Sequence, residues 1–199
     1  LNTEDGKEGT QMSRKFGITS LPTFLVLTPE LTSAGMIRGY APPEPFAKSL
    51  KETRNSHAEF KKRLKNEAKL DYFQRLNLVK DLNARADLDQ SVPRLRKLMT
   101  EKGVPAAVRD QAYYELAVAY SLQNKLTDAQ KTIRELLMLS RAGEAVERSR
   151  LLMGQIYIQQ GNLLQARNEY REFKDRFPDS PLIGNIEQVL AALEKQVPD

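Results

Sequence analysis

Apolar residues recur every three or four positions along most of the chain, which is the spacing of one face of an α-helix. From Phe46 to Val92 the sequence contains neither glycine nor proline, and the helical spacing continues without a break. This region therefore predicts one long helix or two abutting helices. It lacks the Gly/Ser-rich composition of a flexible linker, so we expect a stiff connection.

The second half of the chain repeats itself. Ala166 lies 37 positions after Ala129, and Tyr157 lies 37 positions after Tyr120. Each unit has the pattern of two helices joined by a short turn, and a weaker copy precedes these two. A single helical hairpin cannot bury its own apolar face, so the pattern predicts a stacked array. We place the hairpins at residues 71–102 (degenerate), 105–140 and 147–180, with a capping helix at 181–195.

The first fifty residues follow a different pattern. Residues 9–16 have the spacing of a short helix, and residues 23–27 form an apolar run typical of a β-strand. Residues 36–40 fit a second short strand, and the prolines that begin at Pro42 fit the start of a helix. The order helix, strand, strand, helix predicts a small α/β segment.

Charge is unevenly distributed along the chain. The net charge is +5, and residues 54–102 carry thirteen basic and seven acidic side chains. The cations between Lys61 and Lys69 spread around a helix, which favours a solvated face. An anionic partner is the alternative, but the segment lacks the interleaved aromatic residues expected of a protein that binds single-stranded nucleic acid. We therefore expect no nucleic-acid partner.

The residues needed for most catalytic centres are missing. The 199 residues include no cysteine and one histidine, His57, and the glycines are scattered at turns and do not form a phosphate-binding loop. We expect no catalytic, cofactor-binding or metal-binding residues in this chain. No run of about 18 apolar residues occurs, so we expect no membrane span. The chain starts at Leu1 instead of methionine, which suggests an upstream segment.

In the first segment a Gly17-Ile18 pair precedes a Leu21-Pro22-Thr23 loop, and glycines follow at positions 35 and 39. This order resembles the C-terminal half of a thioredoxin fold, over residues 1–53. The resemblance implies that the Leu21–Pro22 bond is cis, and that Ser20, Leu21 and Pro22 form the edge of a peptide-binding groove. A rigid turn without a ligand is the alternative.

The redox Cys-x-x-Cys of thioredoxin-like proteins belongs to the other half of that fold, which would lie before Leu1. Two strands and two helices alone make a poor core. We expect the chain to be a fragment of a longer oxidoreductase-like protein. The alternative is that another segment or chain completes the sheet.

The repeat units carry a characteristic set of small and bulky residues. The last unit has Met153-Gly154, Tyr157, Gly161, Ala166, Tyr170 and Pro178, and the middle unit has Tyr113, Leu116-Ala117, Tyr120, Ala129 and Ile133. This pattern resembles the tetratricopeptide repeat family. The first unit departs from it, with Val79 where a small residue belongs and Arg75 where a bulky one does.

The resemblance implies a concave face lined by the first helix of each hairpin, which would bind a protein or peptide partner. The residues that we expect to line it are Gln111, Tyr114, Val118, Arg148 and Gln155. The lysines and asparagines with which that family clamps a C-terminal carboxylate are missing. The alternative is that this face packs against the N-terminal segment or a second copy, so a homodimer could form through the array or through the incomplete sheet.

Taken together, the patterns predict a mainly α protein: an array of helical hairpins of tetratricopeptide type (an α-solenoid), preceded by a partial α/β thioredoxin-like segment. Residues 54–70 would be a helical connector and residues 71–199 the repeats. We expect a protein-interaction scaffold that presents partners or substrates to the thioredoxin-like domain. The alternative is a fragment of a thiol–disulfide oxidoreductase whose array is a specificity or dimerisation arm. The Phe177-Pro178-Asp179-Ser180-Pro181 ending resembles repeats of bacterial envelope assembly proteins, which favours a periplasmic location over the cytoplasm.

Overall fold

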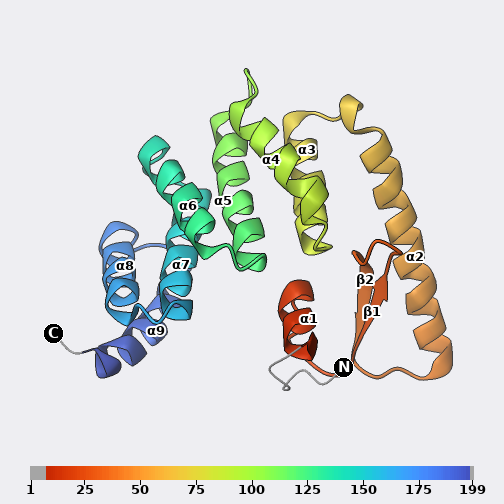
Figure 1. Ribbon diagram of the computed structural model, residues 1–199, viewed down its shortest axis with the longest axis horizontal. Coiled ribbons are helices and arrows are strands. Elements are labelled where there is room, and N and C mark those ends of the chain that lie inside the picture. The colour runs from red at the N-terminus through yellow and green to blue at the C-terminus, as the bar shows by residue number, and fades with distance from the viewer. Residues whose placement is uncertain (1–7, 198–199) are drawn as a thin grey trace. The chain divides into compact units, whose positions relative to one another are not determined.

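The computed structural model describes residues 8–197, so residues 1–7 of the predicted thioredoxin-like segment lie outside it. The chain divides between Leu98 and Met99 into two compact units. The described residues are mainly α-helical, with a small antiparallel sheet near the N-terminus and helical hairpins after it (Figure 1). The predicted fold class, a mainly α array of hairpins preceded by a short α/β segment, is confirmed at this level.

The first unit begins with a helix and a β-hairpin. Helix α1 (Glu8–Phe16) is followed by strands β1 (Thr23–Leu27) and β2 (Ser33–Arg38). The strands are antiparallel and put Phe24 opposite Ile37, with an irregularity between Val26 and Leu27. The Leu21–Pro22 peptide bond before β1 is cis, as predicted.

Helix α2 (Pro43–Lys65) packs against β2. The ring of Phe46 lies 4.9 Å from that of Phe24, edge to face. At Gly35 a side chain would collide with Thr53, so the absence of one lets the helix approach the strand closely. Helix α2 continues without interruption past residue 53, where the sequence pattern had suggested that the α/β segment ends and a connector begins.

The stretch without glycine and proline is not one continuous helix, and it also includes the start of a further helix at Leu88. Helix α2 ends at Lys65, and a short 3-10 turn, η1 (Glu67–Lys69), precedes α3 (Tyr72–Ala84). The Asp71 carboxylate accepts from the backbone of Gln74, whose side chain accepts from the backbone of Asp71. This capping box starts a new helix without any need for glycine or proline.

Helix α3 and the start of α4 (Leu88–Thr100) belong to the first unit, although we had grouped residues 71–102 with the repeats. The physical reason lies in the apolar face of α3. Leu78 and Leu82 are fully buried and form a cluster with Phe60 of α2, flanked by Leu64. The α2 side chains occupy the face that a preceding repeat would otherwise cover.

The second unit contains two helical hairpins and a last helix. The elements are α5 (Ala106–Leu122), α6 (Leu126–Leu139), α7 (Glu144–Gln159), α8 (Leu163–Arg176) and α9 (Ile183–Gln196). Helix α5 packs on α6, α7 packs on α8, and α5 also packs on α7 (Figure 1). Helix α9 closes the stack, because its Ile186, Leu190 and Leu193 join a buried cluster with α8.

The two hairpins turn in the same way, 37 residues apart. Asn124 and Gly161 both have left-handed backbone, with φ of 58° and 76°. The amide of Lys125 donates to the carbonyl of Tyr120 (2.9 Å), and the amide of Asn162 donates to that of Tyr157 (2.8 Å). The repeat seen in the sequence is therefore a repeat of backbone geometry.

Candidate functional site

The candidate interaction surface, which we call the array face, lies on helices α5 and α7. These are the first helices of the two hairpins, and they pack side by side. On α7 the side chains of Arg148, Gln155 and Ile158 are exposed, while Met153 and Ile156 between them are buried. This three-and-four spacing gives α7 one face towards the core and one exposed face.

The structure brings Tyr114 of α5 and Arg148 of α7 together. The Arg148 guanidinium carbon lies 5.5 Å from the centre of the Tyr114 ring, and Nη1 lies 3.3 Å from the carboxylate of Glu144. Burial raises the pKa of the Tyr114 hydroxyl, and the charge of Arg148 partly opposes this. The pair is a cation stacked on an aromatic ring, with the cation still open to solvent.

Gln111, also expected on this face, contributes little accessible surface. Its side chain is 9% exposed. Its amide nitrogen donates to Oε1 of Glu115 at 3.1 Å, within the same helix. The arrangement satisfies two buried polar groups.

The remaining expected residues are Val118, which is partly buried, and Gln155, which is exposed. Sequence reasoning did not single out Leu122, which is 39% exposed and lies one turn beyond Val118. Ile158 of α7 is 37% exposed. The i, i+4 spacing from Val118 was the signal that could have found Leu122. The array face thus combines one exposed cation with exposed apolar side chains.

The second expected site, Ser20, Leu21 and Pro22, is a loop in the first unit. All three residues are exposed, and Leu21 keeps 69% of its surface accessible. The Thr23 hydroxyl donates to the Ser20 carbonyl at 2.6 Å, and the Gly39 amide donates to the Pro22 carbonyl at 2.9 Å. These bonds hold the loop against the hairpin and leave the Leu21 side chain outside.

An apolar cavity of about 380 Å³ adjoins this loop, between α1 and β1. Leu21 and Phe24 line it on one side and Met12 on the other. Within the part of the chain that the structure describes, β1 pairs only with β2, so its second edge has no strand partner. An unpaired strand edge beside apolar side chains can accept another extended segment.

Two ranges of the second unit match known family models. Residues 110–142 and residues 148–180 each match a tetratricopeptide repeat (TPR). The chain contains tetratricopeptide repeats. No curated protein and no solved structure matches the chain. The two TPRs coincide with the α5–α6 and α7–α8 hairpins, and residues 1–53 lie outside both matched ranges.

Stacked TPRs present extended surfaces to protein partners. The matches therefore support a protein–protein interaction scaffold. Between residues 8 and 197, no cluster of three or more histidine, cysteine, aspartate or glutamate side chains could hold a metal ion. None of the helices within this range has the length and apolar character needed to cross a membrane.

Proposed function

We propose that the array face binds a segment of a partner protein and presents it to a thioredoxin-like domain to which residues 1–53 belong. The observation that carries the first part is the exposed Arg148 stacked on Tyr114, on the same two helices as the exposed Leu122 and Ile158. A cation and apolar side chains on adjacent helices suit an amphipathic helix or an extended peptide with an acidic residue.

The array face is tested by placing a photo-crosslinking amino acid at Gln155 and, as the control, at Asn168, which is exposed on α8. The proposal expects a defined partner to crosslink from position 155 and not from 168. Replacing Arg148 with glutamate should abolish that crosslink. Equal crosslinking from both positions would move the interface off this face.

The thioredoxin-like part of the proposal is supported by the residues around the loop at Ser20, Leu21 and Pro22. The loop precedes a two-stranded antiparallel hairpin, and α2 covers one face of that hairpin. The open edge of β1 and the exposed Leu21 provide places where a substrate strand could pair and pack. We expect a peptide bound there to lose affinity when Leu21 is replaced with aspartate.

The alternative function is a piece of a thiol–disulfide oxidoreductase, in which the TPRs form the specificity or dimerisation arm. Residues 1–199 have no thiol and cannot carry out dithiol exchange. The gene that encodes the chain discriminates between the two functions. A Cys-x-x-Cys encoded about 20 codons before Leu1 would support the enzyme, and its absence would leave a binding protein.

We also propose a periplasmic location and self-association as subsidiary features of this function. The ending at 177–181 supports the first, by its resemblance to envelope proteins. The open β1 edge supports the second. The location is tested by fusing a reporter to the full-length gene product and determining in which compartment the fusion is found. Analytical ultracentrifugation at several concentrations tests self-association, since a monomer at all of them would exclude a dimer through the array or the sheet.

A further inference from the structure

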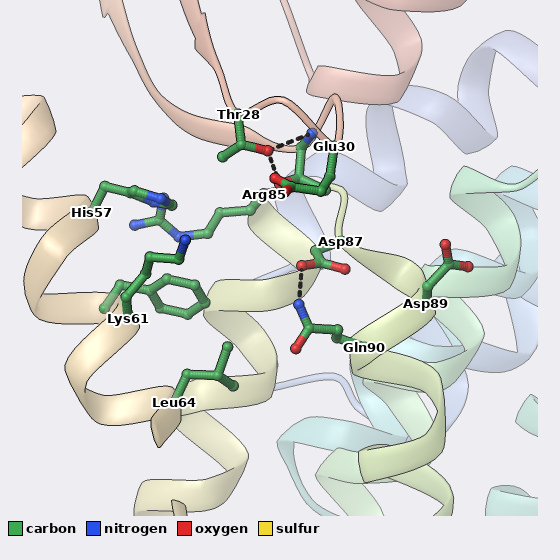
Figure 2. A pocket seen from close by; sticks show the side chains of 11 residues that line it. Thr28, Glu30, His57, Lys61, Leu64, Arg85, Asp87, Asp89 and Gln90 are labelled. Atoms are coloured by element: carbon green, nitrogen blue, oxygen red, sulfur yellow. Dashed lines mark hydrogen bonds between the residues drawn. The ribbon is translucent and has the colours of Figure 1, made fainter. Parts of the chain in front are cut away.

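A second cavity of about 380 Å³ lies within the first unit, away from the loop at Ser20 to Pro22. Three structural segments wall it: the turn between β1 and β2, one side of α2, and the corner between α3 and α4 (Figure 2). Six ionisable side chains line it: Glu30, His57, Lys61, Arg85, Asp87 and Asp89. The TPR function uses none of them.

Arg85 reaches from the end of α3 towards α2 (Figure 2) and is held by four contacts. Its Nη1 donates to the carbonyls of Ser33 (3.0 Å) and Ala34 (2.8 Å), and lies 3.3 Å from Nδ1 of His57. The guanidinium carbon sits 4.3 Å from the centre of the Phe60 ring. The contacts of Nη1 and the stacking on the Phe60 ring therefore fix the position of the guanidinium.

The other edge of this guanidinium is open. Among the described residues, Nε and Nη2 of Arg85 have no hydrogen-bond acceptor. These two parallel N–H groups are the fork that binds both oxygens of a carboxylate. Lys61 lines the same wall, and no described carboxylate lies within ion-pair distance of its ammonium.

The lowered pKa of His57 indicates that this wall is electropositive. Burial lowers the pKa of its imidazole, the charges of Arg85 and Lys61 lower it further, and only Glu30 among the nearby groups raises it. In the neutral form Nδ1 can accept the hydrogen bond from Arg85. The wall formed by α2 and Arg85 thus holds two cations and a neutral imidazole.

The opposite wall is acidic. Asp87 and Asp89 line the α4 side, and Gln90 donates to the Asp87 carboxylate at 2.6 Å. Glu30 lies at the β1–β2 turn (Figure 2). Phe60 and Leu64 add an apolar surface on the α2 side. The cavity therefore has donors on the α2 side and acceptors on the α4 side, and the Glu30 carboxylate interacts electrostatically with Lys61 and His57.

Two left-handed residues shape these walls. Leu31 (φ 56°) follows Glu30 in the β1–β2 turn, and Ala86 (φ 55°) joins Arg85 to Asp87. Neither is glycine, so each conformation costs about 1–2 kcal/mol. At Ala86 the backbone makes the same helix-ending turn as at Asn124 and Gly161, since the amide of Asp87 donates to the carbonyl of Leu82 at 2.9 Å.

We propose that this cavity binds a ligand of amino-acid or dipeptide size that bears a carboxylate and a nearby N–H donor. The carboxylate lies against the open edge of Arg85 and the ammonium of Lys61. The N–H donor faces the wall with Asp87 and Asp89, and Phe60 and Leu64 contact the apolar part. A free zwitterion and the C-terminal residue of a peptide share this chemistry.

The test uses three ligands: the dipeptide Gly-Leu, its N-acetyl form, and its C-terminal amide, which has no carboxylate. His57 is the single histidine of the chain, so its imidazole signal in NMR is assigned without ambiguity. A bound carboxylate places negative charge beside the imidazole. It should therefore raise the pH midpoint of the His57 titration, and the amide should leave that midpoint unchanged.

A matched pair of variants locates the site. Lys61→Ala should weaken binding of Gly-Leu about tenfold, the size expected for one charge-assisted hydrogen bond. Lys62→Ala is the control, because that ammonium pairs with Glu59 at 2.6 Å and does not line the cavity. It should bind like the unaltered chain. Both lysines are exposed, so the fold should survive either change.

The three ligands and the two variants together distinguish the possible ligands and test whether the cavity binds a carboxylate. Binding of Gly-Leu but not of its N-acetyl form identifies a free zwitterion, and binding of both identifies a peptide C-terminus. The proposal is overturned if neither carboxylate ligand shifts the His57 signal at millimolar concentration. It is also overturned if the amide binds equally well, or if Lys61→Ala and Lys62→Ala weaken binding to the same extent.

Discussion

At the scale of single residues, the tightest requirement in the second unit is at Gly154. A Cβ atom there would overlap the ring of Tyr170, which is buried in the cluster between α8 and α9. The small residue is needed because α7 and α8 approach each other where the Tyr170 ring lies. The TPR pattern in the sequence contains this pair because one residue makes room for the other.

In Gly154→Ala, overpacking of the core should cost about 1–3 kcal/mol, and the better helix propensity of alanine should return about 1 kcal/mol. The expected net loss of stability is therefore up to about 2 kcal/mol. Urea denaturation measures the effect. Gly184→Ala in α9 is the control, since an added Cβ there meets nothing within 4 Å. That substitution should be neutral or slightly stabilising, and equal loss at both positions would contradict the packing explanation.

His57 should make stability depend on pH. Its pKa in the folded chain is lower than its ordinary value of about 6.5, first because of burial and then because of Arg85 and Lys61. The unfolded chain therefore binds the proton more readily than the folded chain. Stability should fall as the pH drops below about 6.5 and stop falling on this account once the pH is below the folded pKa.

The check is the urea midpoint between pH 7.5 and 5, compared with that of His57→Gln. Glutamine can accept a hydrogen bond from Arg85 but does not titrate. The variant should lose the part of the pH dependence that lies just below pH 6.5. Parallel curves for the two proteins would show that His57 does not contribute.

At the scale of elements, α7 and α8 are joined by a buried ion-pair network as well as by apolar packing. The Arg150 side chain is 7% exposed, and its two terminal nitrogens lie 2.9 Å from Glu169 and 3.0 Å from Glu172. Burial raises the pKa of Glu169, and the charge of Arg150 opposes this. The network sets how the two helices face each other.

Arg150→Ala should destabilise the chain by about 3 kcal/mol, because it leaves a buried carboxylate without its partner. Urea denaturation is again the measurement. Lys174→Ala removes an exposed pair with Glu187, so it should change the midpoint little. Similar losses for the two variants would mean that burial does not distinguish these pairs.

At the scale of the whole molecule, the chain is two units with different bases of stability. The second unit stacks two TPRs and a closing helix over clusters such as that of Tyr170, Phe173 and Ile186. The first unit packs helix α2 against a two-stranded sheet. A two-stranded sheet is marginal alone, so the contacts of α2 with β2 and α3 carry that unit.

A fragment of residues 103–199 should therefore fold by itself, since repeat stability is local to neighbouring hairpins. Circular dichroism should show a helical fragment with a cooperative thermal transition. Introducing Arg150→Ala into the fragment should lower the midpoint of that transition, as we also expect for the full chain. A helical fragment without a cooperative transition would show that the second unit depends on the first.

Much of the fold could be predicted from the sequence, for a physical reason. The hairpins of the second unit follow from the helical spacing, from turns at Asn124 and Gly161, and from the small residue opposite Tyr170, all of which act between near neighbours. The array face was expected from the resemblance to the tetratricopeptide repeat family, which places the first helix of each hairpin on the concave side. The contact between Tyr114 and Arg148 needed the packing of α5 on α7.

What the sequence determined by itself is the repeated hairpin, because its period and its small-to-large pairing are local. Tertiary structure alone decided where the first unit ends and what it encloses. Leu78 and Leu82 of α3 are buried against Phe60 of α2, so this face of α3 packs within the first unit. The cavity collects side chains between positions 28 and 90, from separate elements. His57 and Lys61 share a face of α2 because they are four residues apart, but no spacing rule links them to Arg85, so only folding could bring Arg85 to the same wall.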